Sequence, residues 1–391
     1  MRECFCRALA VTLALLGLCA ASVRAEVRTY TYGGSGYDIL DGIAVSADGR
    51  IALTGHTESS DVALADGAQS RQSGWVLCVD AQGNELWSCL TSYGLREELS
   101  APVFHEDGSL TAVLKTSTET MDELELIRFD RAGEIVLRQT IPTFGEELIS
   151  NWLEKPMNEG YLCWETYKVS DETFRDYYLI AWDGKRLKTW NEQEAPLYLV
   201  ESERHAIVKH ECAAWLAAID GEYNETILAK VTDLDEAWWD DDFEALVSLP
   251  DGGATVAGNY YSGSDGMFIG YLERWDARGN SVFKKWLSGE MIMAFEKTAR
   301  GYAAAVAIDT VSFDLESETP EYEGYMIAFF DEAGVETGRM PLGRGTVLKT
   351  IMLPDGSIAV LKTFVAPSET DDEDEVNLDM RLVIIPPEDI P

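Results

Sequence analysis

The chain has 391 residues and is strongly acidic, with 31 lysines and arginines against 69 aspartates and glutamates and a net charge of −38. A field of this sign repels phosphates and argues against nucleic acid and anionic lipid as partners. Hydrophobic residues make up 46% and aromatic residues 10% of the chain, which excludes a disordered protein and leaves one large repeat domain or two ordinary domains.

The chain begins with the pattern of a secretory signal. Arg2 and Arg7 precede an apolar run from Ala8 to Ala21, which is too short to span a bilayer comfortably. Val23 and Ala25 then stand at the two positions that a signal peptidase reads. We therefore expect residues 1–25 to be removed, and the protein to be secreted or held in the cell envelope.

The exported domain would comprise residues 26–391. Loss of three arginines and one glutamate with the signal leaves a net charge of about −40. Cys19 suggests a lipid anchor, but Leu18 stands where a lipoprotein signal normally has a small residue. No later segment is apolar enough for insertion into a membrane.

Two kinds of glycine turn alternate along the rest of the chain, which indicates an internal repeat. Glycines of the first kind recur about every fifty residues. Most turns of the second kind read Asp-x-x-Gly, in which the aspartate caps its own turn and glycine takes the left-handed conformation that closes a hairpin. The first turns are Ala47-Asp48-Gly49, Glu106-Asp107-Gly108, Asn158-Glu159-Gly160, Pro250-Asp251-Gly252, Ala299-Arg300-Gly301 and Pro354-Asp355-Gly356; the second are Asp80 to Gly83, Asp130 to Gly133, Asp183-Gly184, Asp220-Gly221, Asp276 to Gly279 and Asp331 to Gly334.

Short apolar stretches around these turns have the composition of strands, with many β-branched and aromatic residues. Each unit reads as strand, tight turn, strand, long loop, strand, tight turn and strand. The stretches are 51–55, 75–79, 110–114, 124–129, 161–164, 177–182, 254–258, 268–275, 302–308, 325–330 and 358–361.

One unit is less regular than the others. The distance from Gly160 to Gly252 is nearly twice the period, so a further unit must lie between them. Residues 197–231 fill the gap, with a degenerate first turn near Ser202 to Arg204 and a second turn at Asp220-Gly221. The repeat therefore has seven units.

The last unit lacks a fourth strand, because Arg381 to Ile385 runs directly into Pro386-Pro387. The segment Val27 to Gly33 at the other end of the exported chain offers the missing strand. Pairing of the two ends would close a ring and remove its exposed edges. We therefore expect an all-β fold, a single β-propeller of seven four-stranded blades; six or eight blades, or two stacked sandwiches, are the alternatives.

Two hairpin segments carry a family resemblance. Val79 to Trp87, with the sequence VDAQGNELW, and Leu249 to Gly253, with LPDGG, resemble the blade repeats of secreted bacterial propellers of the quinoprotein-like and cell-surface type. The resemblance implies the fold but defines hairpins rather than chemistry. Only Trp87 keeps the tryptophan after the second turn, where the other copies have Leu137, Phe283 and Gly338, and no adjacent cysteines occur. The resemblance therefore implies no cofactor.

The two faces of such a ring would differ in charge. Both tight turns of every blade fall on one face, and the long loops fall with the connections between blades on the other. The long-loop face would gather carboxylates, among them six in 309–323, seven in 369–379 and seven in 233–244. Binding residues of rigid scaffolds usually lie in such loops.

Aromatic residues on the acidic face are the candidate ligand-binding residues. Trp238 and Trp239 interrupt one acidic connection, and Tyr260 and Tyr261 follow nearby. They could form apolar platforms for a cationic or sugar-bearing ligand. The alternative interpretation is that the tryptophans pack between blades and the carboxylates only solvate the loops.

Calcium is the one cofactor that the carboxylates suggest. Asp372, Asp374, Asn377 and Asp379 alternate as oxygen ligands do in a calcium loop, although no glycine stands at the sharp-turn position of an EF-hand. Four cysteines remain after signal removal, Cys78, Cys89, Cys163 and Cys212; none has metal-site spacing, and their pairing is open.

No catalytic residue can be assigned from the sequence. His56, His105, His205 and His210 stand in strands or at turns, and no nucleophile elbow, zinc helix, phosphate loop or dinucleotide motif occurs. Gly33-Gly34-Ser35-Gly36 lacks the helix that a phosphate loop needs.

The sequence favours a non-catalytic, exported, monomeric propeller that binds an extracellular protein, peptide or glycan through its acidic, aromatic-containing loop face. The alternative function is hydrolysis or lysis of a polysaccharide by carboxylates near the central channel.

Overall fold

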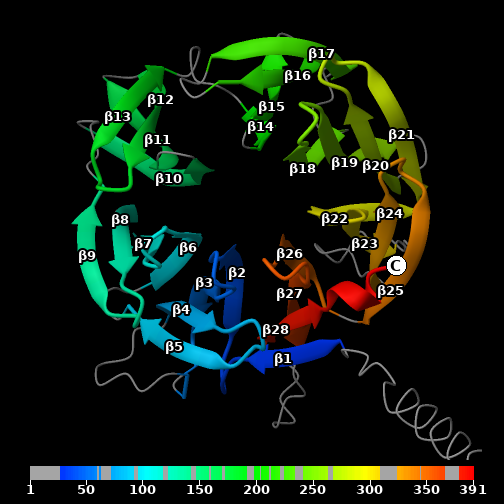
Figure 1. Ribbon diagram of the computed structural model, residues 1–391. Coiled ribbons are helices and arrows are strands. Elements are labelled where there is room, and N and C mark those ends of the chain that lie inside the picture. The colour runs from blue at the N-terminus through cyan, green and yellow to red at the C-terminus, as the bar shows by residue number, and fades with distance from the viewer. Residues whose placement is uncertain are drawn as a thin grey trace, which may run out of the picture.

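Seven four-stranded antiparallel sheets stand around a central axis in the computed structural model (Figure 1). The structure describes residues 27–391 except 60, 63–71, 92–95, 118–121, 142–146, 158–159, 170–171, 192–197, 203, 211–212, 221–223, 234–240, 263–266, 309–323, 344 and 366–377. Each sheet is one blade, and its first strand lies nearest the axis. The protein is therefore a seven-bladed propeller, as the repeat predicts.

The strands follow the order of the chain. Blade one has β2 (Asp38–Val45), β3 (Ile51–Thr57), β4 (Ser73–Val79) and β5 (Glu85–Leu90); blade two has β6 (Arg96–Phe104), β7 (Leu110–Ser117), β8 (Asp122–Phe129) and β9 (Ile135–Thr140); blade three has β10 (Glu147–Met157), β11 (Gly160–Val169), β12 (Glu172–Ala181) and β13 (Arg186–Asn191). Blade four, the irregular unit, has β14 (Tyr198–Glu201), β15 (His205–His210), β16 (Ala213–Ile219) and β17 (Glu225–Asp233).

The remaining blades complete the ring. Blade five has β18 (Asp241–Ser248), β19 (Ala254–Ser262), β20 (Met267–Trp275) and β21 (Ser281–Ser288); blade six has β22 (Glu290–Thr298), β23 (Gly301–Ile308), β24 (Gly324–Asp331) and β25 (Glu336–Gly343); blade seven has β26 (Val347–Met352), β27 (Ile358–Val365) and β28 (Leu378–Ile385). One predicted boundary is wrong: β12 ends at Ala181, because Trp182 already belongs to the tight turn.

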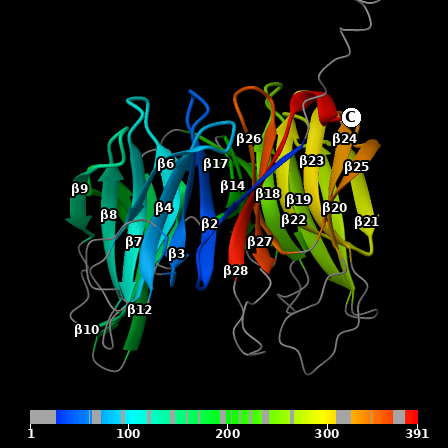
Figure 2. The same ribbon diagram turned by 90° about the horizontal axis from the view of Figure 1, so that it is seen from below.

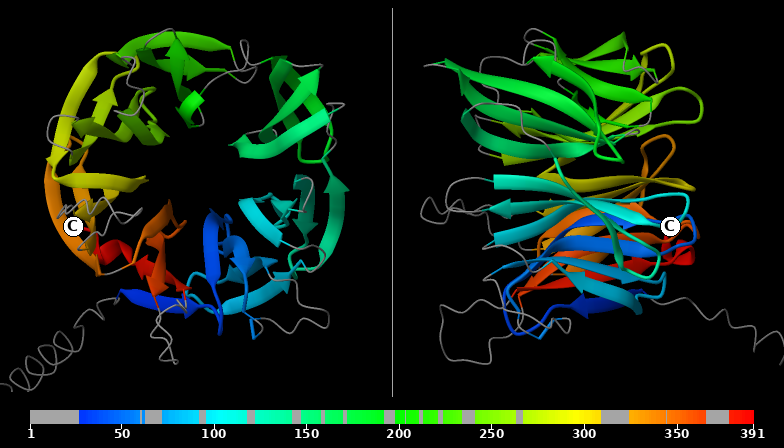
Figure 3. Two further views of the ribbon diagram at one scale, coloured as in Figure 1. Left: turned by 180° about the vertical axis from the view of Figure 1, so that it is seen from behind. Right: turned by 90° about the vertical axis from the view of Figure 1, so that its left-hand side faces the viewer.

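Blade seven is closed by the N-terminal strand. β1 (Arg28–Tyr32) pairs antiparallel with β28, with Arg28 opposite Ile384 and Tyr32 opposite Met380 (Figure 3). The predicted closure is thus confirmed, and β28 has a partner on both sides. β1 begins three residues after the expected signal cleavage site at Ala25.

The second turns follow the predicted chemistry. In blade one the Asp80 carboxylate accepts hydrogen bonds from the backbone N–H groups of Gln82 and Asn84, at 2.8 and 2.9 Å. Gly83 has a φ of +77°, a conformation that costs a residue with a side chain about 1 kcal/mol or more. These tight turns lie at one end of the ring, and the strands between them run roughly along its axis (Figure 2).

The hydrophobic core is divided into wedges between neighbouring blades. Seven clusters of buried side chains fill the seven contacts around the ring. In the wedge between blades one and two, Val76 packs with Leu110 and Phe129. Each blade therefore buries both of its faces, and the fold cannot stop at a single blade.

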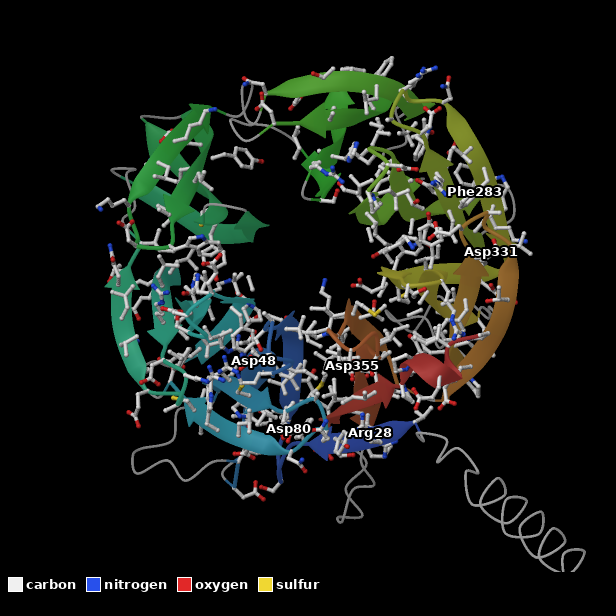
Figure 4. The ribbon with its side chains drawn as sticks, in the orientation of Figure 1. Arg28, Asp48, Asp80, Phe283, Asp331 and Asp355 are labelled. Atoms are coloured by element: carbon white, nitrogen blue, oxygen red, sulfur yellow. The ribbon has the colours of Figure 1, made fainter. Side chains whose placement is uncertain are left out.

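The second turns also join the blades. A Cβ atom on Gly133 would lie 2.6 Å from the ring of Trp87, which stands on β5 of the preceding blade. Gly334 has the same relation to Phe283 of β21. Figure 4 labels Phe283 and also Asp331, the first residue of the turn that contains Gly334. Glycine is needed there both for its backbone conformation and because the neighbouring ring fills the space.

Arginines of the tight-turn face join the blades a second time. The Arg50 guanidinium donates to the carbonyl of Gly108, at 3.0 Å, and Arg204 donates to the carbonyl of Leu249, at 2.7 Å. Arg300 donates to the carbonyl of Ile390 near the C-terminus, at 2.7 Å. These three arginines are therefore structural ties between blades.

Each inner strand carries a register shift against the second strand of its blade. In blade one the shift lies between Leu40 and Gly42, so Asp41 is the extra residue of the bulge. In blade two it lies between Ser100 and Val103, and Ala101 there has a φ of +50°. Bulges re-aim side chains, and these bulges lie on the strands nearest the central axis.

Candidate functional site

The structure describes only some of the predicted aromatic residues. Trp238 and Trp239 lie outside the described residues, and Tyr261 is placed only by the backbone of β19. Tyr260 is described and keeps 38% of its surface exposed. Its position follows from the strand, because β19 runs from the tight turn towards the long-loop end of blade five.

Tyr260 belongs to a group of side chains that we call the aromatic patch: Tyr260, Tyr271, Lys284 and Trp286. Tyr260 stands opposite Ile269, and Tyr271 stands opposite Trp286, so β19, β20 and β21 present them on one face of blade five. Trp286 keeps 47% of its surface exposed, whereas Tyr271 is buried. The patch is therefore open at its outer edge.

The rings of the patch form a corner. The centroids of Tyr260 and Trp286 are 6.3 Å apart and their planes meet at 76°. Tyr271 supports the indole from below, with its centroid 5.6 Å away and its plane tilted by 53°. Offset and edge-to-face contacts of this kind hold aromatic rings in place, so the two exposed walls are preorganised.

One ion pair adds charge to the patch. The Lys284 ammonium lies 4.8 Å from the Trp286 ring centroid and 5.1 Å from that of Tyr271. Its Nζ atom is 3.1 Å from Oε2 of Glu273, and the Ser281 hydroxyl donates to Oε1 of the same carboxylate at 2.9 Å. The charges of Lys284 and Glu273 therefore balance within the site.

Sequence reasoning missed Trp286, Tyr271 and Lys284. The available signal was the run Lys284-Lys285-Trp286 in an outer strand, where two lysines beside an aromatic residue indicate solvent on at least one face. The sequence does not say which aromatic residue of an outer strand faces the next blade.

A second group of polar residues lies on the inner strands of blades one, two and seven. Asp41 on β2 interacts electrostatically with Glu98 on β6 and with Lys349 on β26. Burial, and next the Glu98 carboxylate, raise the pKa of Asp41 to about 6. Oδ1 of Asp41 is buried and has no hydrogen-bond partner among the described residues.

The described histidines do not form an acid–base site with one another. Burial lowers the pKa of His56, which stacks on Tyr37. Nε2 of His105 lies 2.6 Å from the Thr111 hydroxyl, and Nδ1 of His205 lies 2.9 Å from the Ser248 hydroxyl. The side chain of His210 lies outside the described residues.

The glycine-rich loop Gly33 to Gly36 uses its backbone within the protein. Gly34 N donates to Asp38 at 2.6 Å, and Ser35 N donates to Asp61 at 2.8 Å. Gly36 N donates to the Ser59 hydroxyl at 2.8 Å. The loop holds the protein's own carboxylates, so these N–H groups cannot also cradle a phosphate.

Most of the predicted calcium ligands cannot be placed. Asp372, Asp374 and Asn377 lie outside the described residues. Asp379 stands on β28, where burial and then the Asp38 carboxylate raise its pKa. No group of three or more Asp, Glu, His and Cys in the described part of the chain is arranged for a metal ion. Calcium binding by the 372–379 loop stays a prediction.

The described cysteines are free thiols. Cys78 stands opposite Trp87 and Cys89 stands opposite Val76, so the two sulfurs are not cross-strand partners. Cys163 is buried and also free, while Cys212 lies outside the described residues. Burial raises the pKa of the Cys78 thiol to about 11, which makes it a poor nucleophile.

These sheets define the protein as a seven-bladed β-propeller with an open aromatic patch on blade five. Within residues 27–391 as described, no helix is long and apolar enough to cross a membrane. Membership of the quinoprotein-like group stays a prediction, and Trp87, which carries that resemblance, packs against the next blade.

No known protein family matches the chain, and no curated protein does. Similar solved structures include Hsv2 from Kluyveromyces lactis, at 10% identity and a TM-score of 0.42 over 88% of this chain and 98% of that one. Hsv2 from Kluyveromyces marxianus has 11% identity and a TM-score of 0.42 over 88% and 97%. A eukaryotic initiation factor has 9% identity and a TM-score of 0.35 over 91% and 98%. None of these likenesses says which ligand this chain binds.

Proposed function

We propose that this protein is an exported, non-catalytic propeller that binds a protein, peptide or glycan ligand at the aromatic patch of blade five. The observation that supports the proposal is the exposure of Trp286 and Tyr260 as two neighbouring, nearly perpendicular walls. Exposed aromatic residues held rigidly on a scaffold give large contact area at low entropic cost.

The test is a comparison of two double variants on an array of glycans, peptides and secreted proteins. Trp286→Ala with Tyr260→Ala should abolish capture of every ligand that the unmodified protein holds. The matched control is Leu86→Ala with Leu187→Ala, because both leucines lie on outer strands and are 49% exposed. Undiminished ligand capture by the Trp286→Ala, Tyr260→Ala double variant would contradict the proposal.

Export is the second part of the proposal, and the order of residues 1–25 supports it. The chain should be found outside the cytoplasm with a new N-terminus at Glu26. Mass spectrometry of the secreted and envelope fractions checks this. An uncleaved chain confined to the cytoplasm would contradict it.

A second candidate function is cleavage of a polysaccharide, and Asp41 favours it. A carboxyl group with a raised pKa beside an ionisable carboxylate is the arrangement from which general acids are built. Asp41 on β2 and Glu98 on β6 meet this description on the inner strands of blades one and two. Asp41→Asn should then abolish release of reducing or unsaturated ends from a glycan panel, while Trp286→Ala should not. Absence of any product from the unmodified protein excludes this function on that panel.

A further inference from the structure

The charges around the aromatic patch restrict its ligand. We infer that the patch takes an uncharged sugar, with the apolar face of a pyranose ring stacked on the Trp286 indole. This inference rests on the binding function proposed above and names the ligand class for the same site.

The shape of the corner fits a pyranose. One face of such a ring carries C–H groups, and its edge carries hydroxyl groups. A C–H face can lie on the exposed indole, while the nearly perpendicular ring of Tyr260 borders the edge. Trp286 and Tyr260 are held by Tyr271 and by each other, so little side-chain freedom is lost on binding.

The polar groups of the corner fit hydroxyls. The Trp286 indole N–H and the Tyr260 hydroxyl make no hydrogen bond to any residue that the structure describes. The indole N–H can only donate, and the tyrosine hydroxyl can donate and accept. Lys284 has three donor hydrogens, and the Glu273 carboxylate 3.1 Å away is an acceptor. A sugar hydroxyl, which donates and accepts, can use the indole N–H, the tyrosine hydroxyl and the ammonium, while the buried Glu273 carboxylate holds Lys284 in place.

The ion pair argues against charged ligands. The Lys284 ammonium already occupies the cation–π position on Trp286, at 4.8 Å, so a second cation would meet repulsion there. Anionic sugars meet the field of a protein with a net charge of −38. A neutral ligand avoids both penalties.

Calorimetric titration with defined oligosaccharides tests the inference. The probes are cello-oligosaccharides and chito-oligosaccharides, which are neutral, chitosan oligosaccharides, which are cationic, and oligogalacturonates, which are anionic. We expect at least one neutral probe to bind more tightly than both charged probes. Trp286→Ala should weaken that binding about tenfold, or about 1.4 kcal/mol, and Leu86→Ala should leave it unchanged.

Lys284→Met tests whether the ammonium of Lys284 determines the choice between charged and neutral sugars. If Lys284 only supported the fold, the substitution would not change the relative affinities of these ligands. The substitution removes the ammonium and keeps the length of the side chain. The ratio of chitosan affinity to neutral affinity should rise about threefold, because the cation–π position on Trp286 becomes available. An unchanged ratio would overturn the role assigned to Lys284 and with it the preference for neutral sugars.

The failures of the two proposals are distinguishable. Tighter binding of the chitosan probe than of neutral sugars, lost in Trp286→Ala, overturns the inference and leaves the binding function standing. The same holds if no sugar binds but a peptide or protein is captured in a Trp286-dependent way. Binding of every ligand that persists in Trp286→Ala overturns both.

Discussion

Two tryptophans on equivalent strands differ in whether the neighbouring blade covers them. Trp87 stands on β5, four residues after Gly83, and stacks on Phe129 of blade two with 5.7 Å between ring centroids. Trp286 stands on β21 but seven residues after Gly279, and it keeps 47% of its surface exposed. In blade five the position of Trp87 is taken by Phe283, which contacts Gly334 of the next blade.

The difference depends on which face of the strand each residue occupies. Alternate residues of a strand point to opposite faces of its sheet. Trp87 and Phe283 face the following blade, whose turn covers them. Trp286 faces the preceding blade and lies near the long-loop end, where its outer edge stays open. A tryptophan in an outer strand is thus structural or available according to its register.

The largest expected effect is loss of the structural tryptophan. Trp87→Ala should lower the free energy of unfolding by about 3 kcal/mol, because it opens a cavity between blades one and two. Trp286→Ala should lower it by only about 1 kcal/mol, since 47% of the residue is already exposed in the folded protein. Denaturant unfolding of the two variants checks the contrast. Equal destabilisation would break the comparison.

The second largest loss of stability is expected at Gly133, which contacts the Trp87 ring. Gly133→Ala should cost about 3 kcal/mol, because its Cβ would lie 2.6 Å from the indole and its φ of +89° is strained for alanine. Gly49→Ala is the matched control: its φ is +84°, but the nearest atom to its Cβ would be 3.7 Å away. It should cost about 1 kcal/mol. The difference in thermal stability measures the contact between blades; similar losses would mean that the backbone alone requires glycine.

A smaller effect should follow removal of an arginine tie. Arg50→Ala should cost about 2 kcal/mol, since its side chain is only 9% exposed and donates to Gly108 of the next blade. Arg131, which is 69% exposed and also pairs with Asp48, is the control. Arg131→Ala should cost less than about 0.5 kcal/mol. Chemical denaturation of both variants shows whether the loss of stability depends on the burial of the arginine or on its ion pair with Asp48, which both arginines form.

The smallest effect depends on pH and concerns Asp41. Its pKa in the folded protein is about 6, above the ordinary value of an aspartate, so the folded state binds the proton more tightly. Stability of the unmodified protein should therefore fall as pH rises from about 4 to about 6. Asp41→Asn does not titrate and should be more stable than the unmodified protein by about 1 to 2 kcal/mol at pH 7.

The two proteins should differ much less at pH 4, because Asp41 is then protonated and neutral in the folded state and about half protonated in the unfolded chain. Asp48→Asn provides a control of opposite sign. Its hydrogen bond with Ser46 holds the pKa of Asp48 below the ordinary value, so this substitution should destabilise at pH 7. Melting curves between pH 4 and 7 measure both. An Asp41→Asn gain that is independent of pH would exclude titration as its cause.

Much of the fold followed from the sequence, because its determinants are local. An aspartate that caps its own turn and a glycine with positive φ act within four residues, as Asp80 and Gly83 do. Four copies of that turn within a repeat of seven units, with a lone strand at Val27 to Gly33, predicted a closed ring. Even the irregular fourth blade, from Tyr198 to Asp233, lies in the segment where the fifty-residue period predicts a further unit.

The candidate site was only partly predictable. Tyr260 could be found from its place in an aromatic pair near an acidic connection, but Trp286 could not be told from Trp87 or Phe283. All three are aromatic residues in outer strands. What separates them is whether the neighbouring blade covers that face of the strand, which is a contact between units distant in the chain. The sequence by itself therefore determined the turns, the repeat and its closure, and the tertiary structure decided which aromatic residues remained at the surface.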